Sequence, residues 1–342
     1  MKKIITFGEI MMRLAPRGFL RFSQANNFDL VFGGAESNVA FSLANFGMDT
    51  EFVTRLPKND FGKNALMEMR KYNLGTKYVL QGGDRLGIYF MERGIENRPM
   101  KVVYDRSNSA MSQIKPGMFN WKQIFKNSNW FHWSGITPAI SRSAADVCLE
   151  AIKIARDMGL TISTDLNYRS KLWSYECDPQ NIMTKLTSYS DIIVGNAEAI
   201  KVFFGLELDS NKSHTDKGFN GELFLSICKK IKTKFPSSNK VIITSRESIS
   251  SSYHKWFSVL YDGSNLYQSK KYKFKNIVDR IGGGDAFMSG IIYGLINYPT
   301  DFQKVLSFAS EACCFKHSIS GDVNLASVSE IEKLLNSDYS GI

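Results

Sequence analysis

The sequence predicts an α/β protein with a doubly wound, mostly parallel sheet that is flanked by helices and carries a small β-sheet lid. Two observations lead to this prediction. From about residue 128 onward, apolar strand-like runs alternate with segments of helical periodicity, which is typical of repeated βα units. Before that point, residues 10–32 and 86–106 read as short extended segments that interrupt the alternation. The chain has 342 residues, enough for one large domain with such an excursion.

The first third of the chain supplies the first strand, one clear helix and the lid. The run "KIITFG" reads as a strand, and "ESNVAFSLANFG" reads as a helix, because Val39, Leu43 and Phe46 recur at helical spacing before Gly47. The expected lid strands are "LGIYFMER" (86–93) and "KVVYDR" (101–106), joined by the turn-rich "GIENRPM".

The rest of the chain supplies most of the sheet and its covering helices. The expected strands are "NWFHWSGI", "LTISTDLN", "DIIVGN", "KVIITS" and "WFSVLYDG". The expected helices are Ser141 to Met158, 179–188, 222–234, 285–297, 302–317 and 327–335.

The chain does not divide into two domains at a single point, because it contains no low-complexity linker and no repeat of fixed period. We expect residues 1–9, 33–85 and 107–342 to form the main α/β domain. Residues 10–32 and 86–106 then form the lid.

Composition and charge exclude several classes of protein. Apolar residues make up 43% and charged residues 22% of the chain, which is typical of a folded globular protein. No stretch approaches the roughly 20 apolar residues that span a bilayer, so we expect no membrane partner and a cytoplasmic location. The formal net charge is +10, but no nucleic-acid-binding signature accompanies it, so no nucleic acid is expected as a partner. The five cysteines form no C-x-x-C pair, which argues against a zinc site.

Three consecutive glycines, Gly282, Gly283 and Gly284, directly precede Asp285 in "VDRIGGGDAFMSG". Glycines before a helix let a ligand approach the backbone, and free N–H groups with the helix dipole favour an anion there. From the glycines alone, a tight strand-to-helix turn is an equally good interpretation. Asp285 favours a phosphate cradle, because a carboxylate at this point can accept a proton from an attacking hydroxyl. Neither a P-loop nor a first-turn dinucleotide fingerprint occurs.

This segment resembles the C-terminal signature D-T-x-G-A-G-D of the ribokinase-like (PfkB) carbohydrate kinases. Much earlier in the chain, "GGAESNVAFSLANFG" with "KNDFG" resembles their N-terminal signature. The resemblance covers essentially the whole chain, with both motifs in the expected order. It implies a main domain that binds nucleotide and sugar, a β lid over the sugar site, and Asp285 as general base beside an anion hole formed by the backbone of Gly282 to Gly284.

Arginine and tyrosine residues in two further segments indicate an acidic sugar. "TDLNYRSKLW" places Asn167 and Arg169 after a strand that ends at the carboxyl edge of the sheet, where open α/β sheets bind ligands. "VYDRSNSA" supplies Tyr104 and Arg106 from the lid side. A guanidinium group fits a carboxylate bidentately, although an arginine at a strand end is often only a surface ion pair.

Within the family, D-x-N-x-R followed by Trp, together with Y-x-R-x-x-S-A, resembles the 2-keto-3-deoxygluconate kinase branch. The resemblance implies ATP-dependent phosphorylation of that sugar acid to its 6-phosphate. A kinase of a neutral sugar, such as fructose or ribose, and a non-catalytic sugar-acid sensor remain as alternatives. The substrate contacts that it implies are Gly34 and Asn38 for sugar hydroxyls, Tyr89, Tyr104, Arg106, Asn167 and Arg169 for the sugar acid, and Asp285 for the reacting hydroxyl.

The resemblance also implies ATP and Mg²⁺ as cofactors and leaves K⁺ open. Glu198 is expected to reach Mg²⁺ through water, and Asp279 to contribute to a loop for a monovalent cation. The implied ATP contacts are Asn196, Thr244, Arg246, Gly282 and Gly284.

The chain departs from the family pattern at two places near this site. Ala199 stands where N-x-x-E demands glutamate, which puts the water-mediated Mg²⁺ contacts in doubt. Arg280 stands where the family usually has Thr or Ser, and we expect either a phosphate contact or a surface arginine there. Apolar residues on the lid, Phe28, Leu30 and Phe32, favour a homodimer through the lid, because exposed strand edges and apolar faces tend to be covered.

Overall fold

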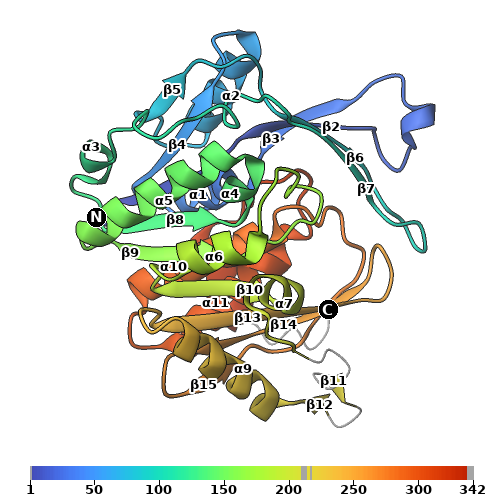
Figure 1. The fold of residues 1–342 in the computed structure, drawn as a ribbon. Coiled ribbons are helices and arrows are strands. Elements are labelled where there is room, and N and C mark those ends of the chain that lie inside the picture. The colour runs from blue at the N-terminus through green and yellow to red at the C-terminus, as the bar shows by residue number, and fades with distance from the viewer. Residues whose placement is uncertain (1, 209–213, 216–217, 337–342) are drawn as a thin grey trace.

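The main sheet contains ten strands in the computed structural model, which describes residues 2–208, 214–215 and 218–336. Every neighbouring pair from β5 to β13 runs parallel, while β14 is antiparallel to β13, β15 and β16 (Figure 1). The prediction of a mostly parallel sheet is therefore confirmed. In spatial order, the strands are β15 (Leu266–Gln268), β14 (His254–Tyr261), β13 (Lys240–Ser248), β10 (Ile192–Asn196), β9 (Thr161–Asp165), β8 (Trp130–Ser134), β1 (Ile4–Phe7), β4 (Thr50–Leu56) and β5 (Val79–Gln81), with β16 (Tyr272–Phe274) on β14.

Helices cover both faces of this sheet, because the strands are apolar on both sides. Ile4 faces one core and Ile5 the other, as expected from the alternation of side chains along a strand. The face of Ile4 is covered by α1 (Ala35–Asn45), α10 (Gly283–Asn297), α11 (Phe302–Lys316) and α12 (Val328–Asn336). The face of Ile5 is covered by α3 (Trp121–Phe125), α5 (Arg142–Asp157), α6 (Pro179–Thr187), α7 (Ala197–Phe204) and α9 (Gly221–Lys234).

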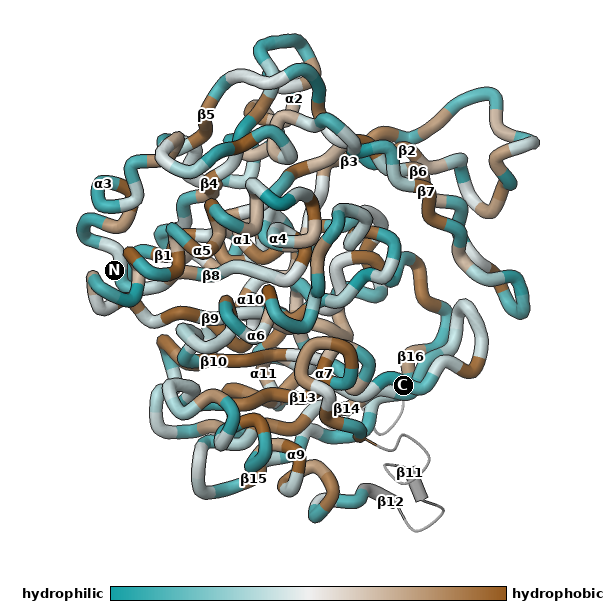
Figure 2. The backbone as a smooth tube through the Cα atoms, viewed as in Figure 1, coloured by the Kyte–Doolittle hydropathy of each residue, from teal (hydrophilic) through white to brown (hydrophobic). Residues whose placement is uncertain are grey.

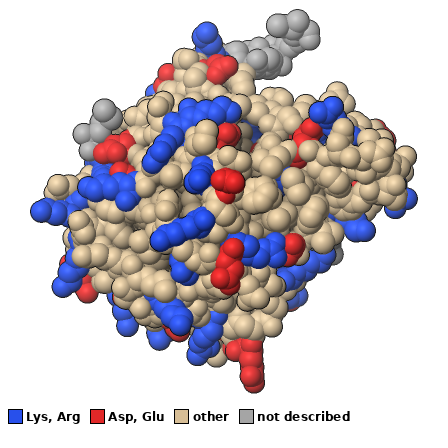
Figure 3. All heavy atoms as spheres, turned by 90° about the horizontal axis from the view of Figure 1, so that it is seen from above, with Lys and Arg blue, Asp and Glu red and all other residues tan. Residues whose placement is uncertain are grey.

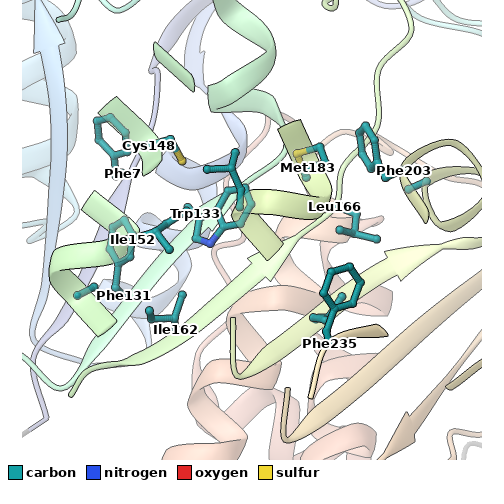
Figure 4. Packing of buried hydrophobic residues seen from close by; sticks show 14 of the residues in the cluster. Phe7, Phe131, Trp133, Cys148, Ile152, Ile162, Leu166, Met183, Phe203 and Phe235 are labelled. Carbon is teal, nitrogen blue, oxygen red and sulfur yellow. The ribbon is translucent and has the colours of Figure 1, made fainter. Parts of the chain in front are cut away.

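Aromatic and aliphatic side chains fill the second of these cores. Figure 4 shows Phe131 and Trp133 from β8 beside Cys148 and Ile152 from α5. All four side chains are fully buried, so Cys148 behaves here as a small apolar residue. The "WFHW" segment is thus core packing, and it is not available as a platform for a sugar.

Capping side chains explain why the helix starts agree with the sequence prediction. The Ser141 hydroxyl accepts a hydrogen bond from the N–H of Ala144 at 3.1 Å, and Asp301 accepts one from Lys304 at 2.9 Å. Such caps satisfy N–H groups that the helix itself leaves free. Outside the two sheets, the structure also contains α2 (Asp60–Lys71), α4 (Ile136–Ile140), the short 3-10 helix Phe22–Gln24, and the pair β11 (His214–Thr215) with β12 (Gly218–Phe219).

A separate four-stranded sheet projects from the main body, as Figure 1 shows. Its order is β3-β2-β6-β7, and β2 pairs with β6 in parallel although the two are far apart in sequence. The expected strands at 86–93 and 101–106 are present as an antiparallel pair. The bounds of this small sheet are β3 (Asp29–Gly33), β2 (Met11–Ala15), β6 (Ile88–Glu92) and β7 (Lys101–Asp105).

The two faces of the small sheet differ in character. Register places Arg13, Tyr89 and Tyr104 side by side on the inner face, which is turned to the main body. The opposite, outer face carries Leu30 and Val103, each 44% exposed. Apolar segments of these strands appear brown in Figure 2. Polar contacts therefore gather on one side of the sheet and exposed apolar surface on the other.

Charged side chains are dispersed over the one face of the molecule that Figure 3 presents. On the face presented in Figure 3, lysine and arginine side chains stand singly or in small groups, with acidic side chains between them. That face carries no continuous basic stripe. Among the described residues, no helix is long and apolar enough to cross a membrane.

Candidate active site

The carboxyl ends of the parallel strands bring the predicted site residues to one edge of the main sheet. Asp165 ends β9, Asn196 ends β10, and Thr244 lies beside Asn196 in the register of β10 with β13. Parallel strands deliver successive loops to the same edge, and ligands bind there in open α/β folds. The fold thus gathers segments from residues 8 to 322 at one place.

The glycine segment forms the start of α10. Gly282 is the N-cap with φ +80°, a left-handed conformation that favours glycine, and a Cβ there would also collide with the carbonyl oxygen of Asp322. A Cβ on Gly283 would lie 2.7 Å from Cε1 of His317, whereas one on Gly284 would meet open space. Packing and backbone geometry therefore require glycine at 282 and 283, while the backbone at 284 is open to a ligand.

Asp285 lies in the first turn of α10, half-buried beside this open backbone. Its Oδ2 accepts a hydrogen bond from Nδ2 of Asn38 at 2.7 Å. Withdrawal from water raises the pKa of Asp285 to about 8, with the charges of Asp165 and Asp322 adding to the rise and Asn38 and Arg169 opposing it. A carboxyl with such a pKa is suited to accept a proton near neutral pH.

The turn after β9 carries two of the expected sugar-acid residues. Asn167 has φ +38°, an uncommon conformation that asparagine tolerates better than most residues, and its N–H donates to Oδ1 of Asp165 at 3.1 Å. Burial raises the pKa of Asp165 to about 6, against the lowering effect of Arg169. The turn brings Arg169 close enough to influence both Asp165 and Asp285 electrostatically.

Three arginine side chains, Arg169, Arg246 and Arg280, lie close enough at this edge to repel one another, and none forms an ion pair among the described residues. Withdrawal from water, followed by repulsion from Arg169, lowers the pKa of Arg246. Withdrawal from water, followed by repulsion from Arg246 and Arg169, lowers the pKa of Arg280. Like charges held together without direct ion pairs form a site that favours an anionic ligand, although Glu198 and Asp279 act on Arg246 and Arg280 from a longer distance. We name these residues the open arginine group.

Other arginines on the inner side of the small sheet are buried and paired. The two terminal nitrogens of Arg13 donate to Oδ1 of Asp322 and to Oδ2 of Asp279, each at 2.6 Å. The hydroxyl of Tyr89 also donates to Asp322. Tyr89, expected as a sugar contact, and Asp279, expected beside a monovalent cation, are thus members of one buried network.

Arg106 occupies a second buried pair. Its Nε donates to Oε2 of Glu9 at 2.9 Å, and its guanidinium carbon lies 5.9 Å from the centre of the Tyr104 ring. Gly34 packs against the backbone of Glu9 so closely that a Cβ at position 34 would collide with the carbonyl oxygen of Glu9. Gly34, Tyr104 and Arg106 are therefore close to one another, although the polar end of Arg106 is engaged by protein.

The side chains expected to bind ATP lie at the end of β10, on β13 and at the start of α7. The side chain of Asn196 accepts from the N–H of Ala199 at 2.9 Å and so caps α7. Ala199 is 1% exposed, so no side chain reaches outward from the position where the family pattern has glutamate. Glu198 is exposed and raises the pKa of Arg246, which places the two side chains near each other. Within the described ranges, no group of three His, Cys, Asp or Glu side chains could hold a metal ion.

Sequence reasoning missed three charged residues of this region, Arg13, Asp165 and Asp322. A usable signal existed for Arg13, because a charged residue inside the apolar run "MMRLA" of a strand must find a buried partner. Asp165 ends β9 and is the first residue of the D-x-N-x-R motif, but sequence reasoning gave this carboxylate no role. Asp322 offered no local signal.

A family model described as pfkB family carbohydrate kinase matches residues 1–325. The crystal structure of a 2-dehydro-3-deoxygluconokinase from Thermotoga maritima is 40% identical in sequence, has a TM-score of 0.92, and is matched over 98% of this chain and 100% of that chain. A 2-dehydro-3-deoxygalactonokinase of Haloferax volcanii is 28% identical over 341 residues, which cover 99% of this chain and 98% of the relative.

A more distant structure shares the fold alone. The fructokinase of Xylella fastidiosa with bound ATP is 18% identical, with a TM-score of 0.78 and 98% of each chain matched. The family match spans nearly all of the chain, including the cradle glycines, Asp285 and the small sheet. Together with the carboxyl-edge site described above, it shows that the chain belongs to the pfkB family of carbohydrate kinases.

Proposed function

We propose that this carbohydrate kinase transfers the γ-phosphoryl group of ATP to the 6-hydroxyl of 2-keto-3-deoxygluconate. The observation that carries the proposal is the open arginine group, which flanks Asp285 and the open backbone of Gly284. A reaction between two anionic substrates needs cationic side chains that are not already neutralised by the protein.

Asp285 is the general base of the proposed step. The C6 hydroxyl oxygen forms a bond to the γ-phosphorus, the bond from that phosphorus to the β–γ bridging oxygen breaks, and ADP leaves with the bond's electron pair. The hydroxyl proton passes to Asp285, whose position Asn38 fixes by the 2.7 Å hydrogen bond. The backbone N–H groups of Gly283 and Gly284 at the start of α10 stabilise the charge on the transferring phosphoryl oxygens.

Mg²⁺ neutralises charge on the phosphates when it is bound with ATP. The exposed carboxylate of Glu198 is suited to hold it through water, since Mg²⁺ usually keeps several waters and needs few protein ligands. Asn196, Thr244 and Arg246 lie on the same strand ends and complete the proposed nucleotide side.

Arg169 is the proposed contact for the sugar carboxylate. It is exposed, its Nη1 donates to the carbonyl oxygen of Tyr168 at 2.9 Å, and its charge lowers the pKa of Asp285 against the effect of burial. Asn167 in the same turn and Tyr104 with Arg106 from the opposite side complete the proposed sugar site, with Gly34, Asn38 and Tyr89 for its hydroxyls. Similarity to the 2-dehydro-3-deoxygluconokinase of Thermotoga maritima supports an acidic sugar.

The direct test measures ADP release by the purified protein with ATP and Mg²⁺ on several sugars in parallel. The panel contains 2-keto-3-deoxygluconate, its galactonate epimer, 5-keto-2-deoxygluconate, 2-ketogluconate, fructose, ribose and adenosine. We expect kcat/KM for the keto-deoxy acid to exceed that for fructose and ribose by orders of magnitude. Better turnover of a neutral sugar would keep the kinase and contradict the sugar acid, and turnover of none would favour a non-catalytic sensor.

The variant Arg169→Leu separates the carboxylate contact from the rest of the site. We expect KM for the sugar acid to rise by about 10-fold to 100-fold, the scale of a lost charge-assisted pair, with KM for ATP nearly unchanged. Arg156→Leu is the matched control. Nη1 of Arg156 lies 2.9 Å from Oδ1 of Asp191, and this ion pair is remote from the candidate active site. An equal rise in KM for fructose would contradict a carboxylate contact.

We also propose that two copies associate through the outer face of the small sheet. Leu30 and Val103 are each 44% exposed there and Phe28 is 38% exposed, so pairing removes apolar surface from water. Light scattering on the purified protein is expected to give twice the mass of one chain, and Val103→Asp to give the single mass. A wild-type monomer would contradict this interface.

A further inference from the structure

A buried cluster of charges lies directly beneath the glycine cradle. It contains Arg13 from β2, Lys316 from the end of α11, and the carboxylates of Asp279 and Asp322. The Arg13 and Lys316 residues are 1% and 0% exposed, and the two aspartates are 4% and 3% exposed. The two buried cations balance the two buried anions, as burial demands, and the partly exposed Arg93 approaches Asp279 from outside at 3.9 Å.

Both carboxylates belong to the loops that shape the cradle. Oδ1 of Asp279 accepts from the N–H of Ile281 at 3.1 Å, and Oδ2 accepts from Gly321 at 3.2 Å. Asp279 thereby joins the loop before α10 to the loop after α11. The position of the cradle thus depends on this carboxylate.

Asp322 holds the other side of the cradle. Its carbonyl oxygen fills the space that a Cβ on Gly282 would need, and its carboxylate fills the space beside Gly33. Gly33 ends β3 next to the proposed sugar site, so one residue contacts both the cradle and the sugar side. Arg13 and the hydroxyl of Tyr89 fix this carboxylate from the small sheet.

The residues around Asp279 do not fit a bound monovalent cation. Both oxygens of its carboxylate already accept hydrogen bonds, and the Arg13 guanidinium lies 2.6 Å from one of them. The Lys316 ammonium is fixed nearby by donation to the carbonyl oxygen of Ile319 at 3.0 Å. A further cation would meet two positive charges and no free carboxylate oxygen on this residue.

We propose that Arg13 is a built-in cation, a positioning residue that holds the two cradle loops together and removes the need for a monovalent cation. Without it, the two buried carboxylates keep only Lys316 as a buried cation beside the partly exposed Arg93, and negative charge beneath the phosphate site is less well balanced. The loops separate, and the anionic phosphates are repelled. The inference rests on the proposed role of the cradle in phosphoryl transfer.

The first measurement compares wild-type kcat in potassium chloride and in tetramethylammonium chloride at equal ionic strength. Tetramethylammonium is too large to take the place of K⁺ in a small site. We expect equal rates and equal thermal midpoints in the two salts. A large loss of rate that K⁺ restores would overturn the built-in cation, whereas a wild-type protein inactive in both salts would instead refute the proposed function.

The second measurement uses chemical rescue of Arg13→Ala. We expect kcat to fall by about 100-fold, the cost of a small misplacement of reacting groups, and millimolar guanidinium chloride to restore at least about 10-fold of it. Urea, which has the same shape without the charge, is expected to restore nothing. Guanidinium should also raise the thermal midpoint of this variant while leaving that of the wild type unraised, because it binds only the folded cavity.

Arg93→Ala is the matched control for the second measurement. Its guanidinium also approaches Asp279, at 3.9 Å, but it is partly exposed and donates mainly to the Ser320 hydroxyl at 2.7 Å. We expect less than threefold change in kcat and no rescue by guanidinium. If Arg13→Ala does not fold, Arg13→Lys keeps the charge but loses the fork. It is expected to lose at least about 10-fold in kcat.

Two results would overturn the proposal. One is a folded Arg13→Ala or Arg13→Lys protein with wild-type kcat. The other is rescue of Arg13→Ala by urea equal to that by guanidinium, since this would show a packing role without charge.

Discussion

Arginine side chains on the two sides of the candidate active site have opposite surroundings. Beneath the small sheet, Arg13 and Arg106 are buried and held by carboxylates. At the open edge of the main sheet, Arg169, Arg246 and Arg280 repel one another and form no direct ion pair among the described residues. The difference shows where a chain with excess positive charge keeps its paired and its unpaired arginines. Burial demands pairing inside, while unpaired charge at the edge stays available to anionic ligands.

Carboxylates follow the same division. Glu9, Asp279 and Asp322 each accept from a buried arginine, while the nearest donor to Asp285 is the neutral amide of Asn38. Burial raises the pKa of Asp322 too, but there Arg13 and Tyr89 oppose the rise and occupy the carboxylate oxygens. The unpaired position of Asp285, with its pKa raised by withdrawal from water to about 8, suits a base.

Asp285→Asn should have the largest effect on this comparison. We expect kcat to fall by roughly 10²-fold to 10⁴-fold, the usual scale for a general base, with folding intact. Asn38 can still donate to the new amide oxygen, so the geometry persists. Steady-state kinetics with circular dichroism provide the check, and near-normal turnover would remove Asp285 from the proposed step.

The pH dependence of the wild type is the control for this variant. Because Asp285 must be deprotonated to act, kcat/KM should rise with pH and level off near the pKa of about 8. The residual activity of Asp285→Asn should lack this rise. The same pH profile in both proteins would assign the titration to another group.

Removal of a paired arginine should affect stability far more than removal of an unpaired one. Arg106→Leu leaves the buried Glu9 carboxylate without its partner and should lower the free energy of unfolding by about 3 to 5 kcal/mol. The matched variant Arg169→Leu should stay within about 0.5 kcal/mol of the wild type. Urea unfolding measures both, and equal losses would erase the distinction between the two groups.

The smallest expected effect concerns the free energy of unfolding as a function of pH. The folded pKa of Asp285, about 8, lies above its ordinary value of 3.8, so the folded state binds more protons between these two pH values. Wild-type stability from this group is lost as pH rises through that window. At pH 8, Asp285→Asn should therefore be more stable than wild type by about 1 to 3 kcal/mol, with the difference shrinking toward pH 4. A difference independent of pH would contradict the raised pKa.

The sequence predicted the main sheet and the helix that follows the three glycines well, because both depend on local signals. The apolar runs at β8, β9 and β10 and the caps at Ser141 and Asp301 act over a few residues, as do the three glycines before Asp285. The parallel order of the strands also follows from repeated βα units.

The pairing of charges could not be predicted in the same way. Arg13 meets Asp322 across 309 positions of the chain, and Arg106 meets Glu9 across 97. No periodicity or spacing in the sequence encodes such partners. The sequence therefore did not indicate that the Tyr89 hydroxyl and the Arg106 guanidinium, both expected to contact the sugar, are hydrogen-bonded to carboxylates of the protein. The expected roles of the open arginine group stay predictions until substrates are tested.

The parallel pairing of β2 with β6 bears on the order in which the molecule assembles. A hairpin can form from neighbouring residues alone, but the pairing of Met12 with Ile88 closes a loop that contains α1, β4, α2 and β5. Closing such a loop costs chain entropy before any contact compensates it, so we expect the small sheet to form late. Arg13 lies near the start of the chain, and its partners Asp279 and Asp322 lie near the end. We therefore expect these ion pairs to form, and to complete the site, only after the main body has folded.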